Sequence, residues 1–223
     1  MADNTMTADR SAPLWDVPVR LFHWGLAAAF VLAWWSAENG EMDWHRRAGY
    51  SIAGLVLFRL GWGLLGSRSA RFGSFVRGPG AVLRYVGGDM LRRDAGNHAG
   101  HNPLGGWSVL IMLALLALQV GLGLFAVDVD GLESGPFSYL VQFDTAREAA
   151  TLHGLVFNVL LVVIALHLFA VMFHLLWKRE NLVRAMITGG QGGFGANVTV
   201  RAVILGLAVA GLLWIAIGWY GQV

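Results

Sequence analysis

The sequence predicts an all-α integral membrane protein, in which a bundle of four transmembrane helices is followed by a fifth, C-terminal transmembrane helix. Two observations predict this fold class. The 223 residues are 56% hydrophobic and only 13% charged, which is far more apolar than a soluble globular domain. The apolar residues also gather in five runs that approach the roughly 20 residues needed to cross a bilayer. Because backbone amides cannot stay unpaired in lipid, we expect each run to form a helix.

The runs are expected at residues 17–35, 48–65, 107–127, 152–177 and 200–219. Before the third run, Asn102 and Pro103 form a helix start, with Asn as the N-cap and Pro in the first turn. Residues 66–101 are rich in Gly and Arg and fit either a short helix on the membrane surface or a solvated basic loop. We divide the chain into a four-helix domain, residues 1–190, and a Gly-rich linker with the fifth helix, residues 191–223.

Charged residues are distributed unevenly over the connections between the runs. Basic residues follow the second and fourth runs, namely Arg68, Arg71, Arg77, Arg84, Arg92, Arg93, Lys178, Arg179, Arg184 and Arg201. Acidic residues occupy the opposite connections, namely Glu38, Glu41, Asp43, Asp128, Asp130, Glu133, Asp144 and Glu148. By the positive-inside rule, the N-terminus lies in the cytoplasm and the C-terminus on the other side. The basic excess therefore belongs to membrane topology, and we expect no nucleic-acid partner.

Histidines in the apolar runs are the most informative residues, because an imidazole inside a membrane helix is costly and usually marks a site. His153 and His167 lie fourteen residues apart in the fourth run. This interval returns to within roughly 40° of the same helix face, about 21 Å further along. With the predicted topology, His45 matches the depth of His153 near the outside, and His23 matches His167 nearer the cytoplasm. The four histidines form two candidate pairs.

Two facing imidazoles are suited to a haem. Neutral imidazole is a normal axial ligand of haem iron, and two of them give a six-coordinate centre suited to electron transfer. Phe157, Leu160 and Ile164 lie on the same face between the two histidines of the fourth run and suit the porphyrin edges. The chain has no cysteine, so any haem must be bound non-covalently. Taken singly, each histidine could instead be a hydrogen-bonded structural residue near a helix end.

Several motifs carry a family resemblance. VRLFHW occurs in the first run, WHRRAGYSIAGLVLFRLGWGLLG in the second, GHNPLGGW before the third, and LHGLVFNVLLVVIALH followed by WKRENLVRAMITG in the fourth. Together they resemble the bacterial cytochrome b561 group, which includes the b-type cytochrome subunits of nickel–iron hydrogenases. The resemblance covers roughly residues 15–190. It implies two non-covalent b haems, a role in moving electrons to or from membrane quinone, and four axial ligands of the iron: His23, His45, His153 and His167.

Three further histidines lie near the predicted cytoplasmic side. His174 follows His167 by seven residues, lies on the same helix face, and competes with it for the haem of His23. The family pattern favours His167. His98 and His101 precede the third run. We expect them not to be ligands, although they could contact a haem edge or take part in quinone protonation.

Three arginines near the histidines are candidate cofactor-binding residues. Arg59 follows His45 by fourteen residues, and its side chain either extends to the membrane interface or pairs with a propionate of the inner haem. Arg46 and Arg47 break the charge rule directly beside His45. We expect them to meet the propionates of the outer haem or an incoming anion.

The sequence thus predicts a dihaem cytochrome b, surrounded by membrane lipid in the bacterial inner membrane, that passes electrons between a periplasmic redox partner and the quinone pool. Acidic periplasmic connections would steer a basic-faced donor such as a soluble cytochrome c, and a hydrogenase is another possible donor. The family resemblance implies quinone oxidoreduction, and superoxide oxidation coupled to ubiquinone reduction is an alternative within the resembled family. A haem-free, histidine-containing transporter is an alternative of another class. It predicts carboxylates inside the spans, and the sequence has none there.

Overall fold

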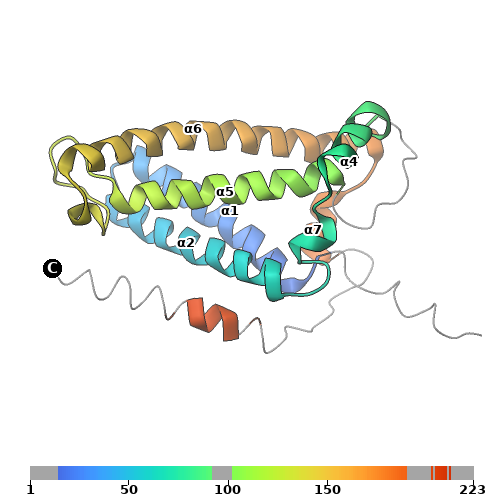
Figure 1. Cartoon of the computed structure of the whole chain (residues 1–223), viewed down its shortest axis with the longest axis horizontal. Helices are drawn as coiled ribbons and strands as arrows, with labels where there is room; N and C mark the ends of the chain where they lie inside the picture. The colour runs from blue at the N-terminus through green and yellow to red at the C-terminus, as the bar shows by residue number, and fades with distance from the viewer. Residues whose placement is uncertain (1–14, 92–101, 190–201, 203, 210, 212–223) are drawn as a thin grey trace, which may run out of the picture.

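The computed structural model describes residues 15–91, 102–189, 202, 204–209 and 211. In this part of the chain the architecture is helical, and four helices are long and apolar enough to cross a membrane. They lie side by side as a bundle (Figure 1) and are α1 (Val17–Glu38), α2 (Met42–Leu65), α5 (Pro103–Phe125) and α6 (Phe143–Phe173). α6 continues into a π-helical turn, η3 (His174–Lys178). The first four predicted spans are confirmed, as is a multi-pass membrane protein.

Local sequence signals set where two of the long helices begin. Asp16 is the N-cap of α1 and accepts a hydrogen bond from the Val19 N–H at 2.9 Å, with Pro18 in the first turn. Asn102 caps α5 in the same way through the Gly105 N–H at 2.6 Å, as the sequence predicts. These side-chain oxygens satisfy N–H groups that have no carbonyl partner inside the helix.

Short helices and charged residues distinguish the two ends of the bundle. One end holds α3 (Phe72–Phe75), α4 (Pro79–Arg84), η1 (Tyr85–Asp89) and α7 (Leu182–Thr188) (Figure 1). The other end holds the α1–α2 turn and the α5–α6 connection, which contains η2 (Ser138–Leu140). We call the first the basic end, after Arg68, Arg71, Arg77, Arg84, Lys178, Arg179 and Arg184. We call the second the acidic end, after Glu38, Glu41, Asp43, Asp128, Asp130, Glu133, Asp144 and Glu148.

The long helices enclose an apolar core near the middle of the bundle. Its buried residues are Ile52 and Val56 of α2, Leu116 of α5 and Leu160 of α6. Leu160 is 1% exposed, so the predicted inward face of α6 does point into the bundle. Large apolar side chains elsewhere on α6 stay exposed, among them Leu155, Val162, Leu166 and Phe169. Because lipid tails are as apolar as these side chains, close packing rather than exclusion of water holds the helices together here.

The fifth predicted span, residues 200–219, falls mostly outside the described residues and stays a prediction, as does the division of the chain at residue 190. Residues 204–209 are helical. Ala202 is buried in a cluster with Val19 and Trp62, and Leu205 packs against that cluster. A Cβ atom added at Gly61 would lie 3.0 Å from a methyl group of Leu205. The small residue at position 61 therefore lets this segment approach α2 closely.

Candidate functional site

The structure brings His45 and His153 together toward the acidic end. His45 lies in the first turn of α2 and His153 in α6, and their ring centroids are 6.0 Å apart with the planes at 75°. The Nδ1 atom of His45 lies 2.9 Å from the carbonyl oxygen of Ala33 in α1. The Nδ1 atom of His153 lies 2.9 Å from the carbonyl oxygen of Gln119 in α5. All four long helices therefore contribute to this acidic-end pair.

The structure also brings His23 and His167 together, toward the basic end. Their ring centroids are 6.5 Å apart and the planes are inclined at 52°. The Trp24 ring meets His23 edge to face, with 5.1 Å between centroids. The Nδ1 atom of His23 is buried and has no hydrogen-bond partner in the described part of the chain. The basic-end pair is therefore held differently from the acidic-end pair.

Hydrogen bonding fixes the tautomer of the acidic-end pair. A carbonyl oxygen can only accept, so the Nδ1 atoms of His45 and His153 carry the proton and donate it to the backbone. In the neutral imidazole this leaves Nε2 unprotonated, with a lone pair available to a metal. A metal-binding histidine usually has this arrangement, in which a backbone carbonyl holds the N–H of the second nitrogen.

The separation of the rings fits one metal ion between the two imidazoles of each pair. A metal–nitrogen bond of about 2 Å and about 1.2 Å from nitrogen to ring centre place two opposite imidazole centroids about 6.4 Å apart. The observed separations are 6.0 Å and 6.5 Å. Two ligands on opposite sides of one ion leave the equatorial positions to a group other than these histidines.

Gly123 of α5 leaves room for the ring of His153. A Cβ atom added here would lie 2.9 Å from Cε1 and 3.2 Å from Nδ1 of that ring, closer than the distance of about 3.5–4.0 Å at which carbon atoms normally pack. The neighbouring Gly121 has nothing within 4 Å of its added Cβ. Gln119, one turn earlier, supplies the carbonyl that holds the same ring. One turn of α5 therefore limits the space for the His153 ring at Gly123 and accepts its hydrogen bond at the Gln119 carbonyl.

Aromatic residues lie between the two pairs. His153 and His167 belong to one uninterrupted α-helix, and Phe157 lies between them. The Phe157 ring stacks on Phe30 of α1, with 6.0 Å between centroids and 22° between planes. It also meets Trp34 at 5.8 Å. The space between the pairs is therefore packed with apolar groups.

His174 lies apart from the His23–His167 contact. Its Nδ1 atom is 2.9 Å from Glu180, and its Nε2 atom is 3.3 Å from the side-chain nitrogen of Asn102. Both ring nitrogens thus have side-chain partners, whereas the ring of His23 faces His167. The structure brings His167, rather than His174, to His23. His98 and His101 lie outside the described residues.

Arg59 points into the protein. The residue is 3% exposed, and its Nη1 atom donates to the Ala70 carbonyl at 3.2 Å. Its guanidinium carbon lies 4.8 Å from the centre of the Phe72 ring. The side chain is therefore packed under the connection that follows α2 instead of extending to water. Pairing with a haem propionate stays a prediction.

Arg46 and Arg47 have different surroundings at the acidic end. Arg46 donates to Glu133 of the α5–α6 connection and, at 2.5 Å, to Asp43. Arg47 is exposed, and its guanidinium lies 5.3 Å from the centre of the Trp44 ring. The charge of Arg46 is thus offset by two carboxylates, while Arg47 remains open to solvent. Their contact with a propionate or an incoming anion stays a prediction.

Comparisons with known proteins identify the family. The sequence profile of prokaryotic cytochrome b561 matches residues 14–189. The chain belongs to the prokaryotic cytochrome b561 family. A relative from Rhizobium leguminosarum bv. viciae, described as a probable Ni/Fe-hydrogenase B-type cytochrome subunit, is 23% identical over 211 residues, covering 81% of this chain and 88% of the relative. No solved structure gave a significant match.

Membership of the prokaryotic cytochrome b561 family implies haem b as the cofactor and membrane electron transfer as the role. The facing imidazoles fit this cofactor, because a porphyrin supplies the equatorial nitrogens and leaves two opposite axial positions. The donated Nδ1 protons of the acidic-end pair fit it as well, since they leave Nε2 free. The family resemblance of the sequence is confirmed, and the assignment of individual ligands stays a prediction.

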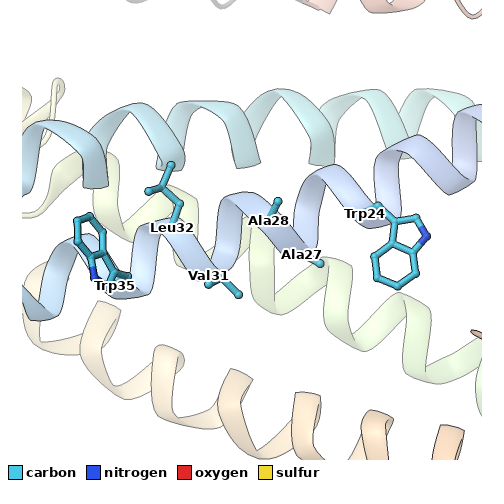
Figure 2. Close-up of a pocket in the computed structure, with 6 residues that line it drawn as sticks. All are labelled: Trp24, Ala27, Ala28, Val31, Leu32 and Trp35. Atoms are coloured by element: carbon cyan, nitrogen blue, oxygen red, sulfur yellow. The ribbon is translucent and has the colours of Figure 1, made fainter.

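The α1 helix of this cytochrome b561 also carries an apolar groove (Figure 2). Trp24 and Trp35 lie at its two ends, and the residues between them are Ala27, Ala28, Val31 and Leu32. Trp24 is 45% and Trp35 53% exposed, so the groove opens on the surface of the bundle. Its lining contains no histidine and no charged side chain. The groove therefore offers no ligand to haem iron.

Sequence reasoning missed several groups that shape the sites of this cytochrome b561. Ala33 acts through its backbone oxygen, which leaves no trace in the sequence. Gln119 and Gly123 interrupt an apolar run, and such interruptions could have marked a close approach to α5. Asp16, followed by Pro18, carries a helix-start signal. Its carboxylate also accepts from the Trp62 indole at 2.9 Å.

Proposed function

We propose that the chain is a dihaem membrane cytochrome b, with one haem b between His45 and His153 and the other between His23 and His167. The observation that supports this most strongly is the presence of two imidazole pairs, with centroid separations of 6.0 Å and 6.5 Å, at two levels of one bundle. When bound, haem supplies a reversible one-electron centre.

The residues of the chain hold and shield these sites. The carbonyl groups of Ala33 and Gln119 keep the Nδ1 protons of the acidic-end pair and orient both rings. Leu160 and the stacked rings of Phe30 and Phe157 pack the interior between the pairs. An apolar interior of this kind suits the movement of electrons without protons.

The charge distribution supports an orientation and a route. We place the acidic end at the periplasm and the basic end at the cytoplasm of the bacterial inner membrane. In this orientation the chain passes electrons between a periplasmic redox protein and the quinone pool. Exposed carboxylates such as Glu38, Asp130 and Asp144 would attract a basic partner surface, as on a soluble cytochrome c. The hydrogenase subunit among the relatives supports a hydrogenase-like donor instead.

One observation favours a second candidate function, superoxide oxidation with ubiquinone reduction. The exposed Arg47 lies close in sequence to a proposed haem ligand, His45, and among the described residues its cation has the Trp44 ring as a neighbour and no carboxylate partner. Such a cation would attract a small anion to the acidic end. Arg46 supports this less, because Asp43 and Glu133 already offset its charge.

Pigment analysis tests the proposed function. The purified protein should show a reduced-minus-oxidised absorbance band of b type and two haems per chain. His153→Ala and His167→Ala should each remove one haem, while the matched control His174→Ala should keep both. A colourless preparation from haem-sufficient cells would refute the proposal and favour the haem-free transporter. Mixing the reduced or oxidised protein separately with quinol, superoxide and cytochrome c identifies the partner.

We assign residues 1–190 to the dihaem domain and residues 191–223 to a linker and a fifth transmembrane helix. The contact of Leu205 with Gly61 supports a position for that helix beside α2. Because the histidine pairs use only α1, α2 and α6, a chain ending at residue 190 should still bind two haems. Loss of either haem on this truncation would contradict the assignment.

A further inference from the structure

The two histidine pairs differ in the hydrogen bonding of Nδ1 among the described residues. At the acidic end, the Nδ1 atoms of His45 and His153 both donate to backbone carbonyls at 2.9 Å. At the basic end, the Nδ1 atom of His23 is buried without a hydrogen-bond partner among the described residues. An imidazole whose N–H is held by a carbonyl is a stronger electron donor to its metal. Stronger donation stabilises oxidised over reduced iron and so lowers the midpoint potential.

Buried charge also favours a lower midpoint potential at the acidic end than at the basic end. In the described part of the chain, the buried charged side chains are those of Asp16, Arg20 and Arg59. All three lie at the basic end, and Arg20 is one helical turn before His23. Buried charges are weakly screened, and a net positive charge favours reduced iron, which carries one positive charge less than oxidised iron. At the acidic end, Arg46 is only partly buried and is offset by two carboxylates.

Ser36 modifies one of the bonds at the acidic end. This residue is 0% exposed, and its hydroxyl donates at 3.0 Å to the carbonyl of Ala33. The same carbonyl accepts the Nδ1–H of His45. The Ser36 hydroxyl and the His45 Nδ1–H thus share the Ala33 carbonyl as acceptor, and the bond from the hydroxyl weakens the hydrogen bond between this carbonyl and the imidazole. Ser36 therefore moderates the electron donation of His45.

We propose that the acidic-end haem has the lower of the two midpoint potentials and that Ser36 is a positioning residue that sets this potential through Ala33 and His45. The inference rests on the proposed dihaem function. With haems held by His45 and His153 and by His23 and His167, this order of potentials would favour the movement of one electron from the acidic-end pair, which would be oxidised, to the basic-end pair, which would be reduced. No bond is broken and no proton moves in this step.

A redox titration of the purified full-length holoprotein tests the order of the potentials. Two one-electron waves are expected, and His153→Ala assigns them, because it removes a ligand of the acidic-end haem only. We expect the wave of lower potential to disappear. Disappearance of the wave of higher potential would overturn the proposal.

Ser36→Ala tests the order without removing a ligand. With the hydroxyl gone, the Ala33 carbonyl pulls harder on the His45 proton, so the lower midpoint potential should fall further while the higher one stays. The matched control is Ser51→Ala on α2, because the exposed Ser51 hydroxyl donates to the Arg47 carbonyl at 2.9 Å and should move neither wave. An unchanged or raised lower potential in Ser36→Ala, or a shift of the higher wave, would count against Ser36 as a positioning residue.

The haem content separates this inference from the function on which it rests. Fewer than two haems per chain in the unmodified protein contradicts the dihaem function itself. Two haems with the acidic-end potential above the basic-end potential contradicts only the inference drawn from Ser36 and the Nδ1 contacts.

Discussion

Replacing Gly123 with Ala should displace the ring of His153 and weaken haem binding at the acidic end. The added Cβ atom would lie 2.9 Å from Cε1 of the ring, whereas carbon atoms pack at about 3.5–4.0 Å. The ring must therefore retreat from α5 by about 0.6–1 Å. Because Gln119 also lies on α5, the same movement stretches the 2.9 Å contact between Nδ1 and its carbonyl past the range of about 2.7–3.2 Å for a good hydrogen bond.

The magnitude follows from the bond that is lost. Removing the hydrogen-bond partner of a metal-bound histidine typically lowers metal affinity by about 10- to 100-fold, or about 1.4–2.8 kcal/mol. Helix propensity acts in the other direction, because Ala is favoured over Gly inside a helix by about 1 kcal/mol. The fold should therefore survive the change at Gly123, and the loss should be confined to one haem.

The assay is haem content per chain, together with the temperature at which the haem absorbance is lost. The control is Gly121→Ala, two residues away on the same helix, where an added Cβ meets nothing within 4 Å. Gly123→Ala should lose part of one haem and release it at lower temperature, whereas Gly121→Ala should match the unmodified protein. Identical haem content and release temperature in the two variants would refute the reasoning.

Three further changes test other contacts. Asp16→Ala removes the cap of α1 and leaves the buried indole N–H of Trp62 without its partner, so the free energy of unfolding, measured by thermal unfolding, should fall by about 1–3 kcal/mol. The control Asp144→Ala, at an exposed residue, should show no loss of comparable size. Glu133→Gln breaks a partly exposed ion pair with Arg46 and should lower the free energy of unfolding by less than about 1 kcal/mol. A redox titration should show a raised midpoint potential of the acidic-end haem, because a negative charge is removed, and a lowered midpoint potential would contradict this. The ring planes are inclined at 75° in the acidic-end pair and at 52° in the basic-end pair, so the two ferric haems should give distinct EPR signals, and the acidic-end signal should be the more anisotropic. A single EPR signal from the two-haem protein would contradict this geometry.

The sequence was sufficient to predict the first four spans and which histidines meet. An α-helix has a fixed rise and rotation per residue, so the interval between His153 and His167 determined both their depth and their shared face. Charge topology then matched His45 and His23 to these depths. The structure places the rings of both predicted pairs within 6.5 Å of each other.

Contacts that depend on how each helix is rotated against its neighbours were beyond the sequence. The acceptors for His45 and His153 are backbone oxygens, which every residue has. Selecting Ala33 and Gln119 requires the rotation of α1 and α5 about their axes, which weakly amphipathic membrane helices do not encode in their hydropathy. The partner of Arg46, Glu133, lies 87 residues further along the chain and depends on the path of the α5–α6 connection.

The uninterrupted α6 helix carries one histidine of each pair and fixes the distance and the rotation between them. A single residue inserted between His153 and His167 would turn one ring relative to the other by about 100° and shift it by about 1.5 Å. No side-chain adjustment can restore both contacts, so one pair would be separated while the other survived. Substitutions between the histidines only change the packing, but the length of that segment is fixed by the two centres it joins.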